Sequence, residues 1–219
     1  MKSSFSVLLA ASLALAGCGG GSQSAGGQDA SIDISYGGAD GFLFAPLLVV
    51  PVILGLAGNT PHCTVSSGSL PPGVTVQDGC TLIGTPSAPG SFDATISLRV
   101  AGIGTSFSVV VHSDIAVPAL AVVRTTNVQP PDRVLALNAA VDEMAVVSLQ
   151  NFEPQDDVRV SYAEVDGALP AGLALNSMDG TLSGVATARG RYTFSLVATL
   201  SQGALGFNTA AQQVVIDVQ

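Results

Sequence analysis

The chain has 219 residues, of which 11% are charged and 5% aromatic, and it contains no Trp. The length exceeds that of one immunoglobulin-sized sandwich and suits two, and the Gly, Ala, Val, Ser and Thr content favours short strands joined by tight turns. Lys2 is the only lysine, so a chain starting at Cys18 holds six Arg against sixteen Asp and Glu, a formal charge of −10. Such an acidic chain repels phosphate backbones, which argues against nucleic acid as a partner.

The first eighteen residues predict export. A positive charge precedes an apolar stretch at residues 5–16, and Leu15-Ala16-Gly17-Cys18 follows; these are marks of a secretory signal. The last four residues resemble the lipobox of bacterial lipoproteins. This resemblance implies that residues 1–17 form a signal peptide and that Cys18 is acylated and holds the chain in the lipid bilayer. Gly19 at the next position implies the outer membrane, on its periplasmic or surface face. An ordinary signal peptide with an incidental cysteine is the alternative.

Residues 18–30 combine the lipidated Cys18 with a tether rich in Gly and Ser. The run GGGSQSAGGQDA at 19–30 has no apolar periodicity, so it should behave as a flexible coil. Twelve such residues span roughly 20 Å on average. The folded part is therefore expected close to its membrane.

The first repeat, expected over residues 31–114, opens with an alternating strand at 31–36. Residues 42–58 have no charged or polar side chain, so a membrane span is one interpretation of this stretch. The stretch is short for a span and is interrupted by Pro46 and Pro51. Two buried strands, or one strand with a bent entry, explain it better.

Cys63 and Cys80 are the two thiols that remain if Cys18 is acylated. In an exported protein a remaining pair favours a disulfide, which would contribute about 3 kcal/mol by restricting the unfolded chain. Two free buried thiols are the alternative. A metal site is weaker still, because His62 beside Cys63 offers no tetrahedral ligand set at a recognised spacing.

Later strands are predicted from alternation of apolar and polar residues. A hairpin is expected from a strand at 92–100, a turn at 101–105 and a return strand beginning at Phe107. In the second repeat, at 115–219, strands are expected at 118–123, 134–137, 145–149, 158–165 and 192–200, and a last strand around 214–218. A turn is expected at 129–132, and a short hinge between the repeats is expected near 113–118.

One motif occurs twice, about 100 residues apart, which is the length of one sandwich domain. Its residues are Leu70, Pro71, Gly73, Gly84 and Pro86 in the first copy and Leu169, Pro170, Gly172 and Gly184 in the second. The motif resembles that of the Putative Ig domain family of bacterial surface proteins, in the cadherin-like group of sandwiches. The first copy departs at Val74, and the second has Val185-Ala186 in place of Thr-Pro.

This resemblance implies an all-β protein of two tandem Ig-like or cadherin-like β-sandwich domains, at 31–114 and 115–219. The motif has a physical rationale, because prolines and Gly73 fix a turn out of one strand and Gly84 permits a sharp entry to the next. It is a signature of fold and carries no chemistry by itself. The second copy lacks cysteines and must hold its corner by packing and hydrogen bonds.

No catalytic site is predicted. His62 is expected at a turn and His112 at a strand end, both as ordinary surface residues, and the sequence has no Gly-x-Ser-x-Gly elbow. A phosphate-binding loop is argued against by the lack of lysine beyond Lys2. The sequence therefore predicts a non-enzymatic, membrane-anchored lipoprotein that serves protein interaction, adhesion or structural display, with an unidentified envelope or surface protein as partner and no cofactor.

The alternative is a calcium-dependent or glycan-binding module. Calcium would use oxygen ligands from the acidic residues of the second repeat, although no Asp-x-Asp-x-Asp spacing is present: Asp142, Glu143, Glu153, Asp156, Asp157, Glu164 and Asp166. Glycan binding would use exposed aromatic platforms, which are hard to assemble from Tyr36, Tyr162 and Tyr192, and Tyr192 is expected in the core.

Overall fold

The structure is a computed structural model, and it describes residues 32–56, 58, 60–101, 106–123 and 133–219. Strands dominate these residues, and their one helical segment is the short 3-10 helix η1 (Asp78–Cys80). No helix in this described part is long and apolar enough to span a membrane. The predicted signal, lipidated cysteine and tether lie outside the described residues, as do most of the turn at 101–105 and the turn at 129–132.

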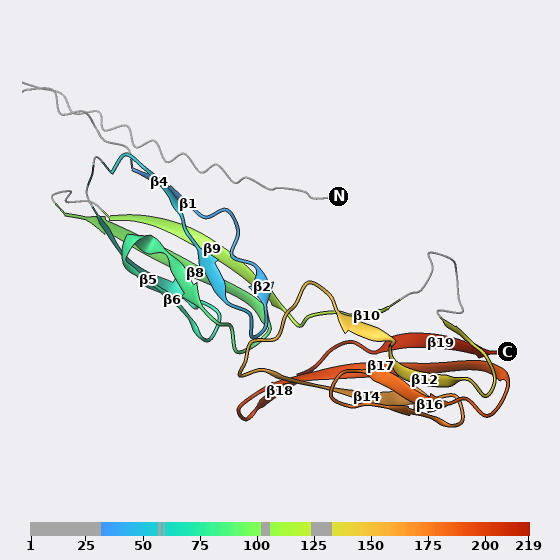
Figure 1. The fold of residues 1–219 in the computed structure, drawn as a ribbon. Helices are drawn as coiled ribbons and strands as arrows, with labels where there is room; N and C mark the ends of the chain where they lie inside the picture. The colour runs from blue at the N-terminus through green and yellow to red at the C-terminus, as the bar shows by residue number, and fades with distance from the viewer. Residues whose placement is uncertain (1–31, 57, 59, 102–105, 124–132) are drawn as a thin grey trace, which may run out of the picture. The chain divides into compact units, whose positions relative to one another are not determined.

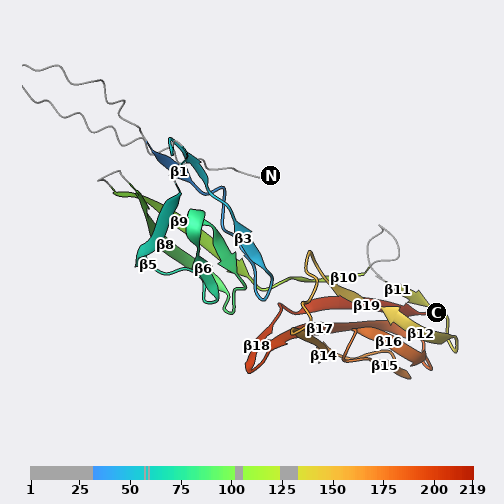
Figure 2. The same ribbon diagram turned by 60° about the vertical axis from the view of Figure 1, so that its left-hand side comes forward.

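The first nine strands form one group of sheets (Figure 1, Figure 2). One sheet has the order β2-β9-β8-β5, a second has the order β3-β7-β6, and β1 pairs with β4. All neighbours are antiparallel except β2 and β9. The bounds are β1 (Asp33–Ser35), β2 (Gly41–Phe42), β3 (Leu47–Val49), β4 (Val52–Leu54), β5 (Pro61–Gly68), β6 (Val74–Val76), β7 (Leu82–Gly84), β8 (Gly90–Val100) and β9 (Ser106–Ala116).

A core between these sheets makes the group a sandwich. Ile96 and Leu98 of β8 are fully buried and belong to one cluster with Leu82 of β7 and Leu47 of β3. The predicted alternation along β8 is confirmed, since every second residue from Ala94 to Val100 is buried. A strand with one apolar face therefore supplies the centre of the core, as its period of two requires.

The remaining strands repeat the same pairing scheme. The order β11-β19-β17-β14 corresponds to β2-β9-β8-β5, including the parallel pair β11 and β19; β12-β16-β15 and β10-β13 complete the match, and β18 is an added strand beside β17. The bounds are β10 (Leu120–Val122), β11 (Arg133–Leu135), β12 (Ala140–Ala145), β13 (Val147–Leu149), β14 (Arg159–Gly167), β15 (Leu173–Leu175), β16 (Thr181–Val185), β17 (Gly190–Gln202), β18 (Leu205–Asn208) and β19 (Gln212–Val218).

The second sandwich has its own core. Phe194 and Leu196 of β17 are buried in one cluster with Ile216 of β19 and Leu182 of β16. The alternation predicted for 192–200 is confirmed, and so is the last strand around 214–218, although Val215 is buried together with Val214 and Ile216. The predicted fold class, an all-β protein of two sandwiches, is therefore observed.

A third apolar cluster takes residues from both halves of the chain. Leu43, Phe44 and Ile115 precede β10, whereas Phe152, Val158 and Leu200 follow it, and all six are buried. The rings of Phe44 and Phe207 meet edge to face, with centroids 5.9 Å apart. Burial of this kind removes apolar area from water and favours folding of the segments together.

Three local expectations are wrong. Residues 42–58 contain three short strands with part of the apolar run exposed, because alternate residues point outward. Strand β12 was not among the predicted strands; Asp142 and Glu143 occupy a bulge between Val141 and Met144 that accommodates them on a sheet. The connection expected near 113–118 is shorter, because β9 continues to Ala116 and Ser113 is buried in it.

The repeated motif brings two backbone segments very close together. In the first copy, Gly73 has φ +88° and Gly84 has φ +148°, and a Cβ on Gly84 would collide with the Gly73 carbonyl oxygen. In the second copy, Gly172 has φ +89° and Gly184 has φ +122°, with the same collision against the Gly172 carbonyl. Only glycine combines these positive φ angles with this close approach. Gly84 ends β7 and accommodates close packing, so its expected role as the entry to a strand is corrected.

Three hydrogen bonds recur in both copies of this corner. In the first, Val74 N donates to Pro71 O, Thr85 N to Gly73 O and Ser87 N to Pro72 O. In the second, Leu173 N, Val185 N and Thr187 N donate to Pro170 O, Gly172 O and Ala171 O. The replacement of Thr-Pro by Val-Ala thus leaves the backbone pattern unchanged, because the amides and carbonyls, and not the side chains, make these bonds.

The predicted disulfide between Cys63 and Cys80 is confirmed. It joins β5 to η1, with the two Cα atoms 5.1 Å apart, and both cysteines are buried in the first core. The hydroxyl of Tyr36 donates to Cys80 O at 2.6 Å, and burial raises the pKa of Tyr36 to about 12. The disulfide therefore anchors the segment between the two halves of the motif.

Replacement of Gly73 by Ala should lower the free energy of unfolding by about 1–3 kcal/mol, because an added Cβ meets Thr85 O and the residue keeps a positive φ. Urea unfolding of the full chain measures this loss. Gly37→Ala is the matched control, since no atom lies within 4 Å of an added Cβ there. Equal stability of the two variants would contradict the close-packing role of Gly73.

Replacement of Cys63 and Cys80 by Ser should destabilise the first sandwich by about 3 kcal/mol, because the unfolded chain regains the freedom of a closed loop. Amide hydrogen exchange measures the two sandwiches separately, with β8 reporting the first and β17 the second. Protection should fall in β8 by much more than in β17. Equal losses in both strands would show that the disulfide does not act locally.

Candidate functional site

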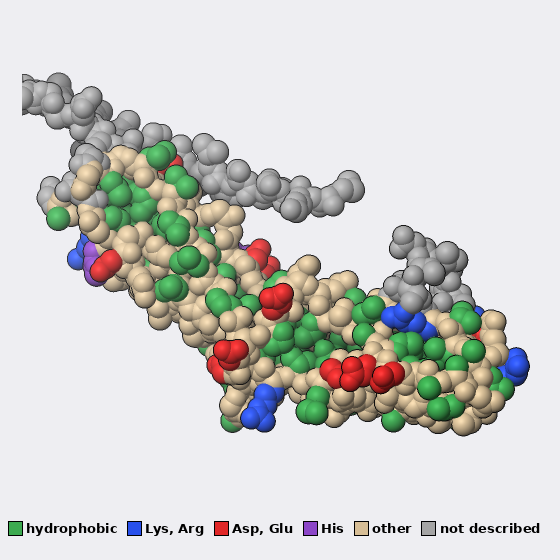
Figure 3. Space-filling view, in the orientation of Figure 1, with side chains coloured by type: hydrophobic (Ala, Val, Ile, Leu, Met, Phe, Trp, Pro, Cys, Tyr) green, Lys and Arg blue, Asp and Glu red, His purple; other side chains and the backbone are tan. Residues whose placement is uncertain are grey.

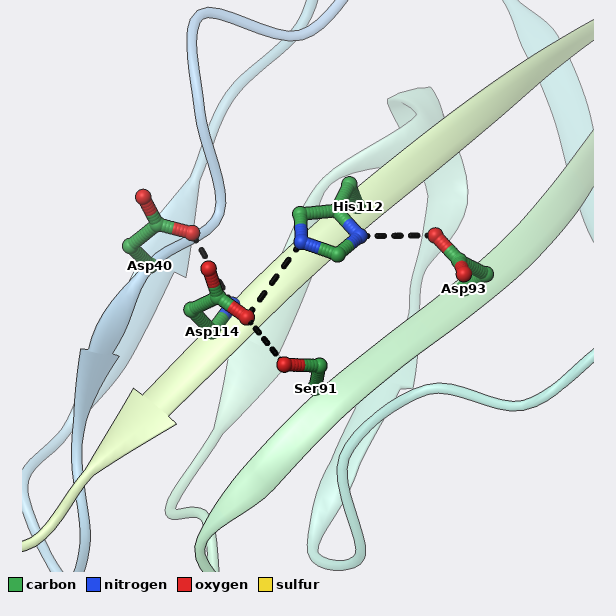
Figure 4. Close-up of polar contacts among 5 residues, drawn as sticks. All are labelled: Asp40, Ser91, Asp93, His112 and Asp114. Atoms are coloured by element: carbon green, nitrogen blue, oxygen red, sulfur yellow. Dashed lines mark hydrogen bonds and ion pairs between the residues drawn. The ribbon is translucent and has the colours of Figure 1, made fainter.

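Five polar residues gather on the outer face of the first sandwich, and we call them the His112 cluster: Asp40, Ser91, Asp93, His112 and Asp114 (Figure 4). Register places four of them opposite one another, because Ser91 pairs with Asp114 and Asp93 pairs with His112 across β8 and β9. Asp40 immediately precedes β2, which lies on the other side of β9. Three strands therefore bring together residues that are up to 74 positions apart.

The imidazole of His112 lies between two carboxylates. Its Nδ1 is 2.7 Å from Asp93 Oδ1, and its Nε2 is 3.3 Å from Asp114 Oδ1. Ser91 Oγ donates to Asp114 Oδ1 at 2.5 Å, and Asp114 N donates to Asp40 Oδ1 at 2.9 Å. The side chain of His112 is 55% exposed, so the cluster lies at the surface.

Charge and hydrogen bonding alter the acidity of this cluster. The hydrogen bond to Asp93 raises the pKa of His112, and the charges of Asp114 and Asp93 act in the same direction. The hydrogen bond from Ser91 lowers the pKa of Asp114, and the nearby His112 also lowers it. The arrangement therefore favours a protonated imidazole between ionised carboxylates.

The geometry does not make a nucleophile and base pair. Ser91 Oγ bonds to Asp114 and not to His112, whereas nucleophilic catalysis by serine requires a base within reach of its hydroxyl. The described residues also contain no group of three or more His, Cys, Asp or Glu side chains arranged to hold a metal ion. What the cluster can do is bind and release a proton and cross-link three strands.

Both histidines differ from their predicted settings. His112 lies inside β9, and His62 lies inside β5, with Nδ1 3.5 Å from Asp78 Oδ1 on an open surface. The predicted hairpin placed Asp93 and His112 on neighbouring strands but not opposite each other, because counting outward from a turn at 101–105 pairs Asp93 with Ser113. The observed register, with Arg99 opposite Ser106, brings Asp93 opposite His112. The contribution of Asp40 had no such signal, since it depends on the parallel pairing of β2 with β9.

The acidic residues considered for calcium are spread over several elements of the second sandwich. Asp142 and Glu143 lie on β12, Glu164 and Asp166 lie on β14, and Glu153, Asp156 and Asp157 lie in the loop before β14. Asp157 Oδ2 accepts a hydrogen bond from Gln202 at 2.7 Å. Figure 3 shows acidic side chains on the visible surface of this sandwich, where they face solvent.

The tyrosines considered for glycan binding are half-buried and packed. Tyr36 packs against the first core, and Tyr162 and Tyr192 pack against the second, as predicted for Tyr192. Tyr162 lies against Gly180, where an added Cβ would meet its ring, and Tyr192 donates its hydroxyl to Ala188 O. Burial raises the pKa of Tyr162, with a further contribution from the charge of Asp179.

Pairing and packing define this chain as a protein of Ig-like β-sandwiches. Residues 122–219 match the family model described as Putative Ig domain, so the family predicted from the motif is confirmed for this part of the chain. The match lies in the second sandwich, and the first shares its strand pairing. No curated protein matches the chain.

The solved structures that are similar to this chain include fragments of cadherins and an enzyme. Drosophila N-cadherin EC1-4 is 14% identical, with 74% of this chain and 43% of that chain covered and a TM-score of 0.34. Mouse cadherin-23 EC22-24 is 16% identical, with 87% and 67% covered and a TM-score of 0.34. An endo-fucoidan hydrolase of glycoside hydrolase family 107 is 15% identical, with 85% and 28% covered and a TM-score of 0.34. The chain thus spans 28% of the hydrolase and 43% of the N-cadherin fragment.

The His112 cluster should make stability depend on pH. A raised pKa in the folded state means that the protonated ring contributes stability fully below the unfolded value of 6.5, and that this contribution is lost as pH rises through the folded pKa. The difference in thermal midpoint between the wild type and His112→Gln should therefore shrink from about pH 5 to 8. A constant difference over this range would contradict the linkage.

Asp93→Asn tests the cause of the shift. Loss of the first carboxylate should lower the pKa of His112, because the largest favourable contribution comes from that hydrogen bond. Titration of the imidazole by NMR measures it directly. An unchanged titration in Asp93→Asn would show that Asp93 does not hold the ring.

Proposed function

We propose that this chain is an exported lipoprotein, anchored by acylated Cys18 in the outer membrane, whose two sandwiches serve protein interaction, adhesion or structural display in the cell envelope. The observation that carries the proposal is the combination of a lipobox at Leu15-Ala16-Gly17-Cys18 with a short tether that leads directly into two sandwiches. Stable attachment to a bilayer requires more than one acyl chain. The resemblance to bacterial lipoproteins implies that Cys18 carries more than one.

The role in binding is supported by the domain class. Residues 122–219 match a model of an Ig domain, and sandwiches of this kind present loops and outer faces from a rigid scaffold. The partner is proposed to be another protein of the envelope or surface, and the role to be non-catalytic.

The free edges of the large sheets indicate where such a partner does not bind. β5 and β14 each form one end of a large sheet, and each contains a bulge, at Val65/Ser67 and at Glu164/Asp166. The opposite ends, β2 and β11, are only two and three residues long, which leaves little edge for another strand. Bulges and charges on an edge oppose the addition of a foreign strand. Recognition through loops or outer faces is therefore the mode we propose.

Replacement of Cys18 by Ala should release the protein from the membrane fraction, because the acylated thiol is the only anchor in the proposal. Fractionation of the producing cells, together with mass spectrometry of the N-terminal peptide, measures attachment and acyl modification. The double variant Cys63→Ser/Cys80→Ser is the matched control and should remain attached. Membrane retention of Cys18→Ala, or an unmodified Cys18 in the wild type, would overturn the lipoprotein proposal.

A further inference from the structure

The first sandwich exposes a row of apolar side chains that its core does not use, which we call the outer stripe: Leu48, Val50, Val52 and Leu54. They are 64%, 65%, 60% and 60% exposed, respectively. They alternate with residues that point inward, of which Leu47 and Pro51 are buried and Val49 and Ile53 pack against the first core. The segment from 47 to 54 is therefore apolar on both of its faces.

An outward face of this kind is unusual in a sheet that meets water. The outer positions of such strands are ordinarily polar, and β8 follows that rule with Ser91, Asp93 and Arg99 outward. The outer stripe also continues across the sheet, because Leu48 lies opposite the half-buried Ile83 of β7. On the β1 side the exposed residues Ser35 and Asp33 lie opposite Val52 and Leu54, so the apolar row has a polar border there. An exposed apolar row with a polar border is typical of a site of contact with another apolar phase.

The position of the stripe in the chain indicates what that phase is. β4, which carries Val52 and Leu54, pairs directly with β1, and β1 begins at Asp33, three residues after the tether ends at residue 30. The tether from Cys18 spans roughly 20 Å on average. An anchored chain therefore holds the stripe near the bilayer, where its contact with lipid is intramolecular and loses no further translational freedom.

The charged residues near the outer stripe bear on which lipid headgroups it can contact. Residues 41–58 contain no charged side chain, so none of the stripe's own residues carries an ion into the interfacial region. Asp33, on β1, lies opposite Leu54 and is exposed. Residues directly opposite each other in an antiparallel pair share a face, so this carboxylate lies beside Leu54 at the end of the stripe and belongs at the level of the headgroups. There it disfavours anionic lipid and leaves zwitterionic headgroups as the contact we consider.

We propose that the outer stripe docks on the surface of the bilayer in which Cys18 is anchored, with the side chains of Leu48, Val50, Val52 and Leu54 in its zwitterionic interface. This inference rests on the proposed lipid anchor. It adds a second membrane contact to that anchor, so the first sandwich lies against the lipid. In Figure 3, hydrophobic side chains are exposed over the part of the first sandwich where Figure 1 labels β1 and β4.

The test uses the lipidated full chain in phosphatidylcholine vesicles, with the native disulfide intact and an environment-sensitive fluorophore on a single new cysteine. Val52→Cys places the label in the stripe. Val110→Cys is the matched control, because Val110 is 68% exposed on β9 of the other sheet of the same sandwich. We expect a blue shift, and quenching by spin-labelled lipid, for the label at 52 and neither effect for the label at 110.

Removal of the neighbouring apolar side chains should reverse this protection. In the background Leu48→Ser/Leu54→Ser, the ratio of docked to undocked label at 52 should fall by about tenfold or more. These positions face outward, so the core is unchanged and the vesicle-bound fraction should stay constant.

Three results would overturn the inference. In the first, the protein binds vesicles but the label at 52 is as exposed to water as the label at 110; the lipid anchor is then supported and the docking of the stripe is rejected. A label at 52 that is already protected without vesicles assigns the stripe to a second copy of the chain. Failure of the chain to sediment with vesicles removes the anchor and, with it, the docking.

Discussion

Close contact between two backbone segments organises each sandwich. At the motif corner, the carbonyl oxygen of one glycine lies so close to the Cα of another that no Cβ fits between them. The pairs are Gly73 with Gly84 and Gly172 with Gly184. A side chain at either position would separate the segments, and three backbone hydrogen bonds around each corner would be lost with them. The corner joins β6 to β7 and β15 to β16, whose buried side chains, Val74, Leu82, Leu173 and Leu182, belong to the cores. The inner face of each sandwich therefore depends on glycines that contribute no apolar surface.

The two sandwiches reach this geometry with different support. The first has a disulfide from β5 to η1 and a tyrosine hydroxyl bound to the same segment. The second has the polar turn after β15, where Asp179 accepts hydrogen bonds from Thr181 N and Oγ1 and from Asn176 Nδ2. The hydrogen bonds from Thr181 lower the pKa of Asp179. A covalent link and a network of charge-assisted hydrogen bonds thus occupy equivalent places in the fold.

The outer surface of the first sandwich has two chemically different regions. The His112 cluster lies on the outer side of β8 and β9, where cross-strand pairs of opposite character stabilise a solvated face. The outer stripe lies on β3, on β4 and on the residues between them, where the exposed side chains are all aliphatic. The inner positions of both regions enter the same core, so packing alone does not explain the difference. A membrane on one side and water on the other does explain it, within the proposal of a lipid-anchored chain.

The amino-acid sequence by itself determined the elements whose signal is local. Period-two alternation located β8, β9 and β17 and the residues that each buries, and the spacing of glycine and proline that occurs twice in the chain defined the repeat. The disulfide between Cys63 and Cys80 was predicted because these are the two cysteines that remain when Cys18 is set aside for acylation. Tertiary structure alone decided what depends on pairing between distant strands. It placed Asp40 beside Asp114, turned Asp142 and Glu143 into part of a bulged strand, and exposed alternate residues of an apolar run that composition suggested was buried. The physical reason is that a side chain's environment depends on which strand lies beside it, and strand order is not written in the local pattern.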